Sequence, residues 1–294
     1  MRIKLIGFDS MGTRGMATVI DTGSLKVFID PGVSLAPRRF GLPPHRIELE
    51  RLNRHLEMIY DEVMDSDIIV ISHYHRDHYL YRIGEEEYYR NKIIYAKHAE
   101  RDINYSQKIR AYILYNKRGV KNIAKKIEYA DNKRYRLDRD VTIEFSPPLP
   151  HGPEGTRLGY VIITTLKVGD KIVVHASDVQ GPISDATARY IAERSPDILI
   201  ISGPPTYFKG YKMDEQEIIR GFHNLERIIS NLRQESIVVV DHHLLRDLDY
   251  ASHLEDIRRV AEERSIEVKT AAEYMGRRPE LLEAMRRQLW KDQR

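Results

Sequence analysis

The stretch DIIVISHYHRDH, residues 67–78, joins a short apolar run to a cluster of polar side chains. An uninterrupted β-branched run of this length predicts a buried strand over residues 67–72. Beyond the strand, alternate side chains point the same way, so His73 and His75 can bind one metal ion from one side. After a turn of the chain, Asp77 and His78 can face a second ion. Because such crowding is unfavourable without a cation, we interpret these four residues as metal ligands rather than as a structural cluster.

The regions on either side of this motif predict a mixed α/β chain. Short β-branched segments bounded by Gly, Asp and Pro indicate strands at 2–8, 17–22, 25–30, 93–96 and 141–146, and a hairpin of 158–166 with 171–177. Helical spacing of apolar residues predicts a helix over 45–64. After residue 178, helices near 185–194, from 214, at 250–264 and at 278–291 alternate with strands at 197–202 and 236–240. These patterns predict a single domain over residues 1–294, a four-layer αββα sandwich in which residues 79–140 form a mostly helical insertion.

The composition narrows the chemistry. The 294 residues include no cysteine, which excludes a disulfide scaffold, a Cys-ligated zinc site and a thiol nucleophile. Any transition metal must then be bound by histidine and carboxylate. No apolar run approaches the roughly 18 residues needed to cross a bilayer, and the N-terminus does not resemble a signal peptide. We therefore expect a cytoplasmic protein without a membrane partner, and a charged-residue content of 31% is typical of thermophilic proteins.

Charge is distributed unevenly along the chain. In total, 47 Lys and Arg against 44 Asp and Glu give a net charge of +3, but residues 74–140 hold 17 basic and 10 acidic residues and 11 of the 18 tyrosines. Basic residues interleaved with aromatic ones can bind phosphate backbones and stack on bases. The alternative, which we favour, is a solvated helical surface with the tyrosines packed beneath it.

The pattern His-x-His-x-Asp-His after an apolar strand resembles the signature of the metallo-β-lactamase fold superfamily of metallohydrolases. Other parts of that pattern follow in order: Asp30 in VFIDPG, His151 in PPLPHGP, Asp178 in VVHASDVQG, and His242 or His243 after SIVVV. The segments DSMGTRGMAT (9–18) and DPGVSLAPRRFGLPPH (30–45) resemble, more closely, an archaeal family of predicted hydrolases within the superfamily.

The resemblance implies a role for each of these residues. One metal ion would be bound by His73, His75 and His151, the other by Asp77, His78 and His242, with Asp178 as the bridging carboxylate. His243 remains the alternative to His242, and Asp30 would brace the site without binding metal.

The implied activity is that of a dinuclear metal-dependent hydrolase. Two divalent ions, zinc by preference and iron or manganese as alternatives, would activate a bridging hydroxide that attacks an ester-like or phosphodiester bond, and Asp77 and Asp178 would be the catalytic carboxylates. We expect phosphodiesterase, lactonase or related esterase activity on a small substrate, with room for broad specificity. Two alternatives stay open: a nuclease that binds RNA or DNA through the basic, Tyr-rich segment, and a binding module without catalysis. The oligomeric state is not predicted.

Several loop residues are candidates for substrate binding. Arg14, in the loop after the first strand, and Arg38 and Arg39, in the Pro-rich loop after Asp30, could receive an anionic group. The alternative is that these arginines tie surface loops together through salt bridges. Ser10 and Thr13 share the first loop. We interpret His175 as a structural histidine and Tyr207 as a residue that could line the cleft.

Overall fold

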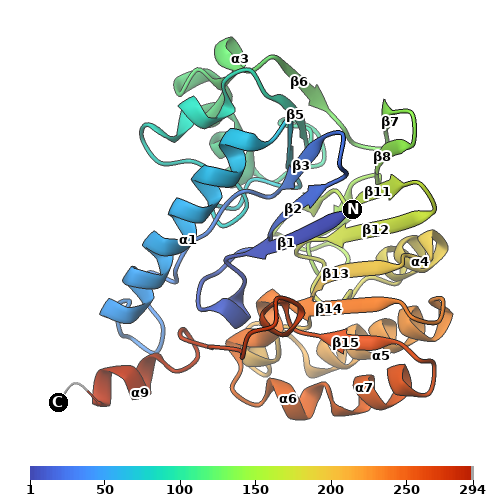
Figure 1. Ribbon diagram of the computed structural model, residues 1–294. Helices are drawn as coiled ribbons and strands as arrows, with labels where there is room; N and C mark the ends of the chain where they lie inside the picture. Colours follow the sequence, from blue (N-terminus) through green and yellow to red (C-terminus); the bar gives the residue numbers. More distant parts are fainter. Residues whose placement is uncertain (293–294) are drawn as a thin grey trace.

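The computed structural model describes residues 1–292 and contains two β-sheets packed face to face (Figure 1). The first sheet has the strand order β1-β2-β3-β4-β5-β6. Its strands are β1 (Arg2–Ile6), β2 (Ala17–Asp21), β3 (Lys26–Ile29), β4 (Ile68–Ile71), β5 (Ile93–Ala96) and β6 (Lys126–Tyr129). The first three strands form the expected antiparallel meander, and from β3 to β6 neighbouring strands are parallel.

The second sheet has the order β15-β14-β13-β12-β11-β8-β7. Its strands are β7 (Arg134–Asp138), β8 (Val141–Phe145), β11 (Thr164–Val168), β12 (Lys171–Ala176), β13 (Ile198–Ser202), β14 (Ile237–Asp241) and β15 (Glu267–Lys269). Strands β12 to β15 are parallel, and the predicted hairpin is confirmed in β11 and β12, although its first strand begins at Thr164 rather than at residue 158. A separate two-stranded sheet pairs β9 (Leu149–Pro150) with β10 (Tyr160–Val161).

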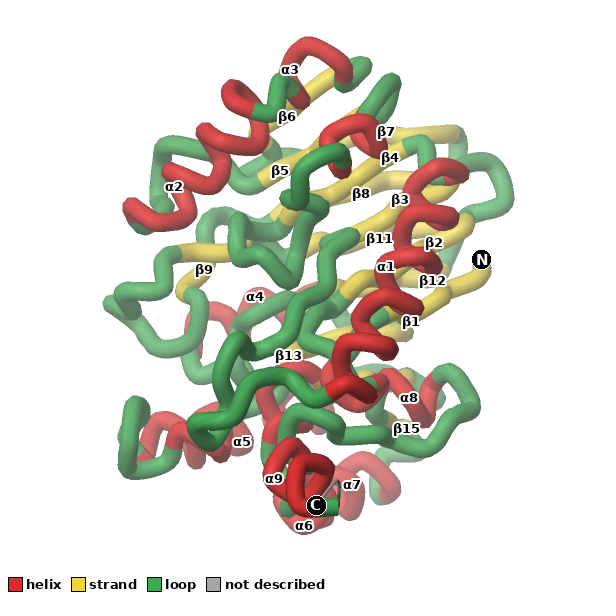
Figure 2. The backbone as a smooth tube through the Cα atoms, turned by 90° about the vertical axis from the view of Figure 1, so that its left-hand side faces the viewer, coloured by secondary structure: helices red, strands yellow, loops and turns green. Residues whose placement is uncertain are grey.

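Helices cover the outer face of each sheet. Figure 2 shows α1 (Arg46–Asp65) across the first sheet, and α4 (Asp185–Arg194), α5 (Glu215–Asn231) and α7 (Glu255–Glu262) pack on the second. The shorter helices are α2 (Tyr105–Tyr112), α3 (Val120–Ile123), α6 (Tyr250–His253), α8 (Ala271–Tyr274) and α9 (Arg286–Lys291). Single turns of 3₁₀ or π helix are η1 (Asp9–Met11), η2 (Glu85–Tyr89), η3 (Ile113–Lys117), η4 (Thr206–Phe208) and η5 (His242–Arg246). Among residues 1–292, no helix combines the length and apolar character that a membrane crossing requires.

Three hydrophobic cores separate the four layers. Successive strand residues point to opposite faces, so Ile68 and Val70 of β4 enter the core between the sheets while Ile69 and Ile71 pack beneath α1. In β13 the same alternation sends Ile200 inward and its neighbours outward, toward α4, α5 and α7. Both faces of each central strand are therefore buried, which explains the uninterrupted apolar runs. The predicted αββα sandwich is confirmed.

Residues 79–140 are less helical than expected. They contain α2, α3, η2 and η3, but also β5 and β6 of the first sheet and β7 of the second. The sequence KIEY (126–129) extends the parallel edge beside β5, and RYRLD (134–138) pairs with β8. Both are edge strands in which polar residues alternate with apolar ones, a period-two pattern too short to stand out within a basic segment. The prediction of a mostly helical segment was therefore wrong. At the C-terminus, only Arg286–Lys291 of the expected helix 278–291 is helical.

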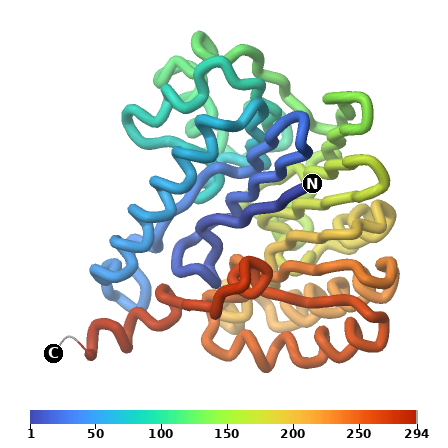
Figure 3. Tube along the Cα trace, viewed as in Figure 1, coloured from blue at the N-terminus to red at the C-terminus, as the bar shows by residue number. Residues whose placement is uncertain are grey.

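The C-terminal segment folds back onto the beginning of α1, as Figure 3 shows. The Arg286 side chain is fully buried and donates to both carboxylate oxygens of Glu48, at 2.8 and 2.7 Å. It also donates to the carbonyls of Ala36 and Leu42, and the Trp290 indole donates to the carbonyl of Pro43. A guanidinium buried without such partners would be strongly destabilising. The segment thereby holds the Pro-rich loop 31–44 in place.

Candidate metal centre

The candidate ligands follow the carboxyl ends of strands from both sheets. Asp30 follows β3 and His73 follows β4, two parallel neighbours in the first sheet. Asp178 follows β12 and His242 follows β14, which flank β13 in the second sheet, and His151 follows β9. Because parallel strands end at one edge of a sheet, these side chains meet where the edges of the two sheets face each other.

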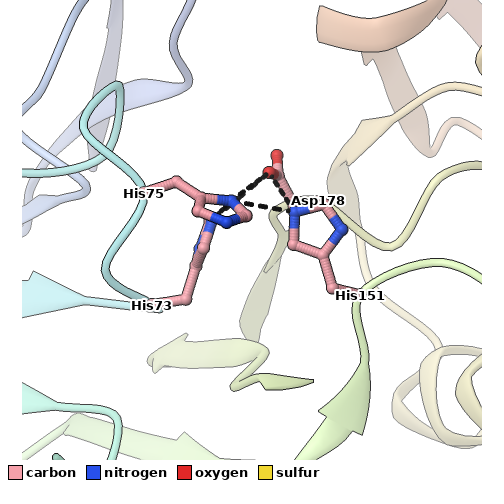
Figure 4. A group of neighbouring side chains, drawn as sticks. All are labelled: His73, His75, His151 and Asp178. Carbon is pink, nitrogen blue, oxygen red and sulfur yellow. Dashed lines mark hydrogen bonds and ion pairs between the residues drawn. The ribbon is translucent and has the colours of Figure 1, made fainter. Parts of the chain in front are cut away.

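The first cluster contains three imidazoles and one carboxylate oxygen (Figure 4). Nε2 of His73 and Nε2 of His151 each lie 3.1 Å from Nδ1 of His75. Oδ2 of Asp178 lies 3.2 Å from His73 Nε2 and 2.7 Å from His151 Nε2. All four atoms lie within 4.8 Å of one another, the convergence that a tetrahedral N/O site requires.

The second cluster uses the other oxygen of Asp178. Oδ1 lies 3.4 Å from His78 Nε2 and 3.0 Å from His242 Nε2. Asp77 completes the group, with its oxygens 3.8 Å from His78 Nε2 and 3.9 Å from His242 Nε2. Asp178 therefore presents one oxygen to each cluster, the arrangement of a bridging carboxylate.

Two unsatisfied atoms indicate that the residues present fit a pair of cations. His78 Nε2 and Asp178 Oδ1 are buried, and despite the short distances around them neither forms a hydrogen bond of regular geometry within the described residues. Leaving such groups unpaired costs about 1–3 kcal/mol each, so their convergence favours a bound cation. Imidazole and carboxylate donors suit zinc, iron or manganese.

The charges of the clustered side chains also favour bound cations. Burial disfavours the charged form of Asp178, but His78 and His242 hold its pKa well below the usual range. Burial lowers the pKa of His73 to about 3, so this imidazole is neutral. At His78 burial acts against protonation, yet Asp178 and Asp77 raise its pKa well above the usual value. Without an ion, a proton on His78 thus supplies the positive charge that the carboxylates require.

Two aspartates orient the ligands of the second cluster. Asp30 Oδ2 lies 3.0 Å from Nδ1 of His78 and accepts a hydrogen bond from Ser72 Oγ, as a bracing carboxylate would. Asp9 Oδ2 lies 2.7 Å from Nδ1 of His242, and Asp9 Oδ1 accepts from Nε of Arg246 at 2.8 Å. Such partners fix the imidazole orientation and raise its basicity as a ligand. Sequence reasoning missed Asp9, although its position just after the first strand parallels that of Asp30.

The backbone is strained at three of these positions. Asp30, Asp178 and His242 adopt φ angles of 50°, 53° and 61°. This left-handed region costs roughly 1–2 kcal/mol for a residue other than glycine. Nearby, a Cβ on Gly32 would lie 2.2 Å from the backbone nitrogen of Tyr79, directly after His78. Strain and close packing together fix the directions of the candidate ligands.

Replacing Asp9 with asparagine is expected to weaken metal binding at the second cluster by about 10- to 100-fold. The charge that supports His242 is lost, and Arg246 loses its carboxylate partner. Competitive titration against a chromogenic chelator measures the two metal affinities separately. Asp21→Asn, at the far end of β2, is the matched control. Equal weakening of both affinities, or none, would contradict the assigned role of Asp9.

A cleft of about 720 Å³ opens over the clusters. His75, Asp77, His151 and Asp178 form its floor. Its walls carry seven cationic side chains, which are Arg14, Arg38, Arg39, Arg76, Arg110, Lys212 and Arg246. Asp77 and Asp178 are the only carboxylates of residues 1–292 that line it. The walls of the cleft are therefore strongly cationic.

Some of these cations are paired and others are not. Arg14 donates to both carboxylate oxygens of Glu283, at 2.6 Å each, and Arg39 lies 3.9 Å from the same carboxylate. These arginines lower the pKa of Glu283 to about 2 against the effect of burial. Within residues 1–292, no ion pair involves Arg38, Arg76, Arg110 or Lys212, whose charges remain available to a ligand. All three arginines singled out from the sequence line the cleft, and Arg14 also ties loops together.

The remaining sequence candidates divide between the cleft and the interior. His243 lines the cleft, and its ring centroid lies 4.4 Å from that of His242 and 6.1 Å from that of His151. Tyr207 also lines the cleft, where its hydroxyl accepts from Arg246. His175 is buried and lies 2.9 Å from the carbonyl of Met16, away from the cleft. Ser10 accepts from the amide of Ala272, and Thr13 contacts His55 at 2.7 Å, so both have structural contacts.

The chain is similar to known proteins in sequence and in fold. No family model matches the chain. A UPF0282 protein of the archaeon Aeropyrum pernix is 43% identical over 294 residues, which cover 99% of each chain. An isothiocyanate hydrolase from Delia radicum gut bacteria has a TM-score of 0.55 at 16% identity, covering 91% of this chain and 95% of that one. Zn²⁺-bound PqqB from Methylobacterium extorquens has a TM-score of 0.53 at 9% identity, covering 92% and 98%. The structural matches show a shared fold, the metallo-β-lactamase fold that the motif implied.

Proposed function

This chain belongs to the UPF0282 family, and from that premise and the geometry of its cleft we propose that it is a dinuclear metal-dependent hydrolase of small anionic phosphodiesters. The coarser assignment, a metal-dependent hydrolase, is supported by the fold and by the cluster of histidines and aspartates. The assignment to phosphodiesters rests on the charge of the cleft. Seven cationic side chains line its walls, and the only carboxylates among the described lining residues are Asp77 and Asp178 on the floor. A neutral lactone would gain little from such walls, whereas a phosphodiester anion would be attracted and oriented by them.

The residues of the centre support hydrolysis without a protein nucleophile. When bound, two divalent ions would activate a water molecule and polarise the scissile bond. His73, His75 and His151 would hold one ion, and Asp77, His78 and His242 the other, with Asp178 shared between them. Zinc is the first expectation, by ligand type, and iron and manganese are alternatives.

The walls of the cleft would orient the substrate. Arg38 and Lys212 carry no carboxylate partner within the described residues, so their charges can neutralise the diester. The buried pair of Arg246 and Asp9 holds His242 while the Arg246 guanidinium also faces the cleft. Charged donors held in place in this way would stabilise the negative charge of the anion.

A panel of substrates on protein of measured metal content tests the proposal. Zinc-, manganese- or iron-loaded protein is expected to hydrolyse bis(p-nitrophenyl) phosphate with a kcat/KM at least about 10-fold above that for a lactone or thioester of similar size. The reverse order would point to lactonase or esterase activity. Two bound metals without turnover of any substrate would favour a non-catalytic binding module.

The nuclease alternative receives less support from the Tyr-rich segment. Tyr74, Tyr79, Tyr89, Tyr95 and Tyr115 are buried in the protein interior, whereas Tyr105 and Tyr112 of the same segment are exposed. Buried rings cannot stack on bases. The segment nevertheless contributes Tyr81 and Arg110 to the cleft wall, so it bears on the size of the substrate.

A further inference from the structure

A smaller hollow of about 320 Å³ adjoins the cleft on the side of residues 79–140. The two share Arg76, Tyr81 and Arg110 in their linings, so they adjoin at these three side chains. Arg82 and Arg118 line only the smaller hollow, which we call the annex. Its remaining lining residues are Tyr79, Ile83 and Ile113, so no carboxylate among the described residues faces it.

The arginines of the annex differ in how far they are neutralised. Arg82 pairs with the buried carboxylate of Glu85 at 3.0 Å and lies over the ring of Tyr81. Arg76 lies over the same ring, at 5.2 Å from its centroid, and forms no ion pair within residues 1–292. Arg110 donates to the backbone carbonyl of Tyr74, and the Arg118 side chain has no hydrogen bond or ion pair within the same residues. Three of the four guanidinium charges are thus available.

Two of these available guanidinium groups are partly removed from solvent. Arg110 and Arg118 are half-buried, and a partly desolvated charge is unfavourable unless an opposite charge approaches it. Guanidinium groups present planar, paired donors that match phosphate oxygens. The volume of about 320 Å³ suits one compact anionic group.

We propose that the annex is a second anion-binding site, formed by Arg76, Arg110 and Arg118, which takes a further phosphate group of the same substrate. The inference rests on the proposed function, in which the scissile phosphodiester lies over the candidate metal centre. The preferred substrate is then a phosphodiester that carries an additional phosphate monoester, as in a terminally phosphorylated dinucleotide or a comparable bisphosphorylated small molecule.

The test compares two dinucleotides that share one internal phosphodiester and differ only in having phosphates at both termini or at neither. Metal-loaded protein is expected to cleave the phosphorylated dinucleotide with a kcat/KM about 10- to 100-fold higher, the effect of one charge-assisted contact. Arg118→Ala should reduce the ratio of the two kcat/KM values, phosphorylated over unphosphorylated dinucleotide, to near one. Arg118→Lys should recover part of that ratio. Lys117→Ala removes the same charge one residue away, outside both hollows, and should leave the ratio as in the wild type.

Binding to metal-free protein gives a readout that does not require activity. Isothermal titration should show tighter binding of the phosphorylated dinucleotide, an advantage that shrinks with added salt and in Arg118→Ala. Equal affinities and equal rates for the two dinucleotides would overturn the annex while leaving the hydrolase intact. Tighter binding without hydrolysis of either dinucleotide would overturn the hydrolase and support the annex. Inorganic phosphate that competes only with the phosphorylated dinucleotide would further support the site.

Discussion

Replacing Asp178 with asparagine is expected to lower hydrolytic turnover by about 10³-fold or more and to reduce bound metal from about two ions to about one per chain. Each oxygen of Asp178 faces a different cluster, 2.7 Å from His151 Nε2 and 3.0 Å from His242 Nε2. Asparagine keeps the size of the side chain and tolerates the left-handed backbone at this position. It lacks the charge that both ions would share, so the loss reports on chemistry rather than on folding.

The measurement combines steady-state kinetics with metal analysis of the same preparation. Asp170→Asn is the matched control, because Asp170 precedes the opposite end of the same strand, β12, and is exposed. The control should retain turnover and metal. A variant at residue 178 that keeps turnover within 10-fold of the wild type would refute the bridging role.

Removing the metals is expected to lower the melting temperature by roughly 10 °C. A ligand present at about 1000 times its Kd stabilises the folded state by about 4 kcal/mol, which in a domain of this size corresponds to a shift of that order. The candidate ligands come from both halves of the molecule. His73, His75, Asp77 and His78 follow β4 of the first sheet. His151 follows β9, and Asp178 and His242 follow β12 and β14 of the second sheet. Bound ions would therefore join the two halves of the molecule.

Thermal unfolding of chelated and reloaded protein, each with measured metal content, checks this expectation. The shift should grow with free zinc concentration and should be smaller in Asp178→Asn, which lacks the shared ligand. Magnesium, which prefers all-oxygen sites, should have little effect. Identical melting temperatures for protein with and without two bound metals would contradict a centre that links the sheets.

The parts of the fold that the sequence predicted are those in which one local pattern dominates. Strand β4 is four consecutive β-branched residues, and the meander and the hairpin of β11 and β12 are bounded by turn residues. Strands β6 and β7 escaped notice because they are short and about half of their residues are polar, although β7 pairs with β8 across the short turn at Arg139 and Asp140. The C-terminal helix was overestimated because Leu281 and Leu282 are buried by tertiary contacts outside any helix, and only Arg286–Lys291 is helical.

In the candidate site, too, the residues that the sequence predicted are those in local motifs. The seven side chains named as ligands form motifs at strand ends, and the structure brings all of them together. The supporting groups depend on contacts between distant residues, such as Asp9 with His242, 233 positions apart, and Arg14 with Glu283, 269 apart. The charge of the cleft likewise arises from six separate segments of the chain, none of which stands out alone.

The C-terminal segment has a consequence for the kinetics of folding. Arg286 and Glu48 are 238 positions apart, and contacts of such separation form slowly because a long loop must close first. The Pro-rich loop that carries Arg38 and Arg39 is therefore completed after the sheets, so anion binding should recover later than secondary structure during refolding. Trp290, the single tryptophan, donates to the carbonyl of Pro43 where the C-terminal segment contacts this loop. Its fluorescence therefore reports the rate at which that contact forms.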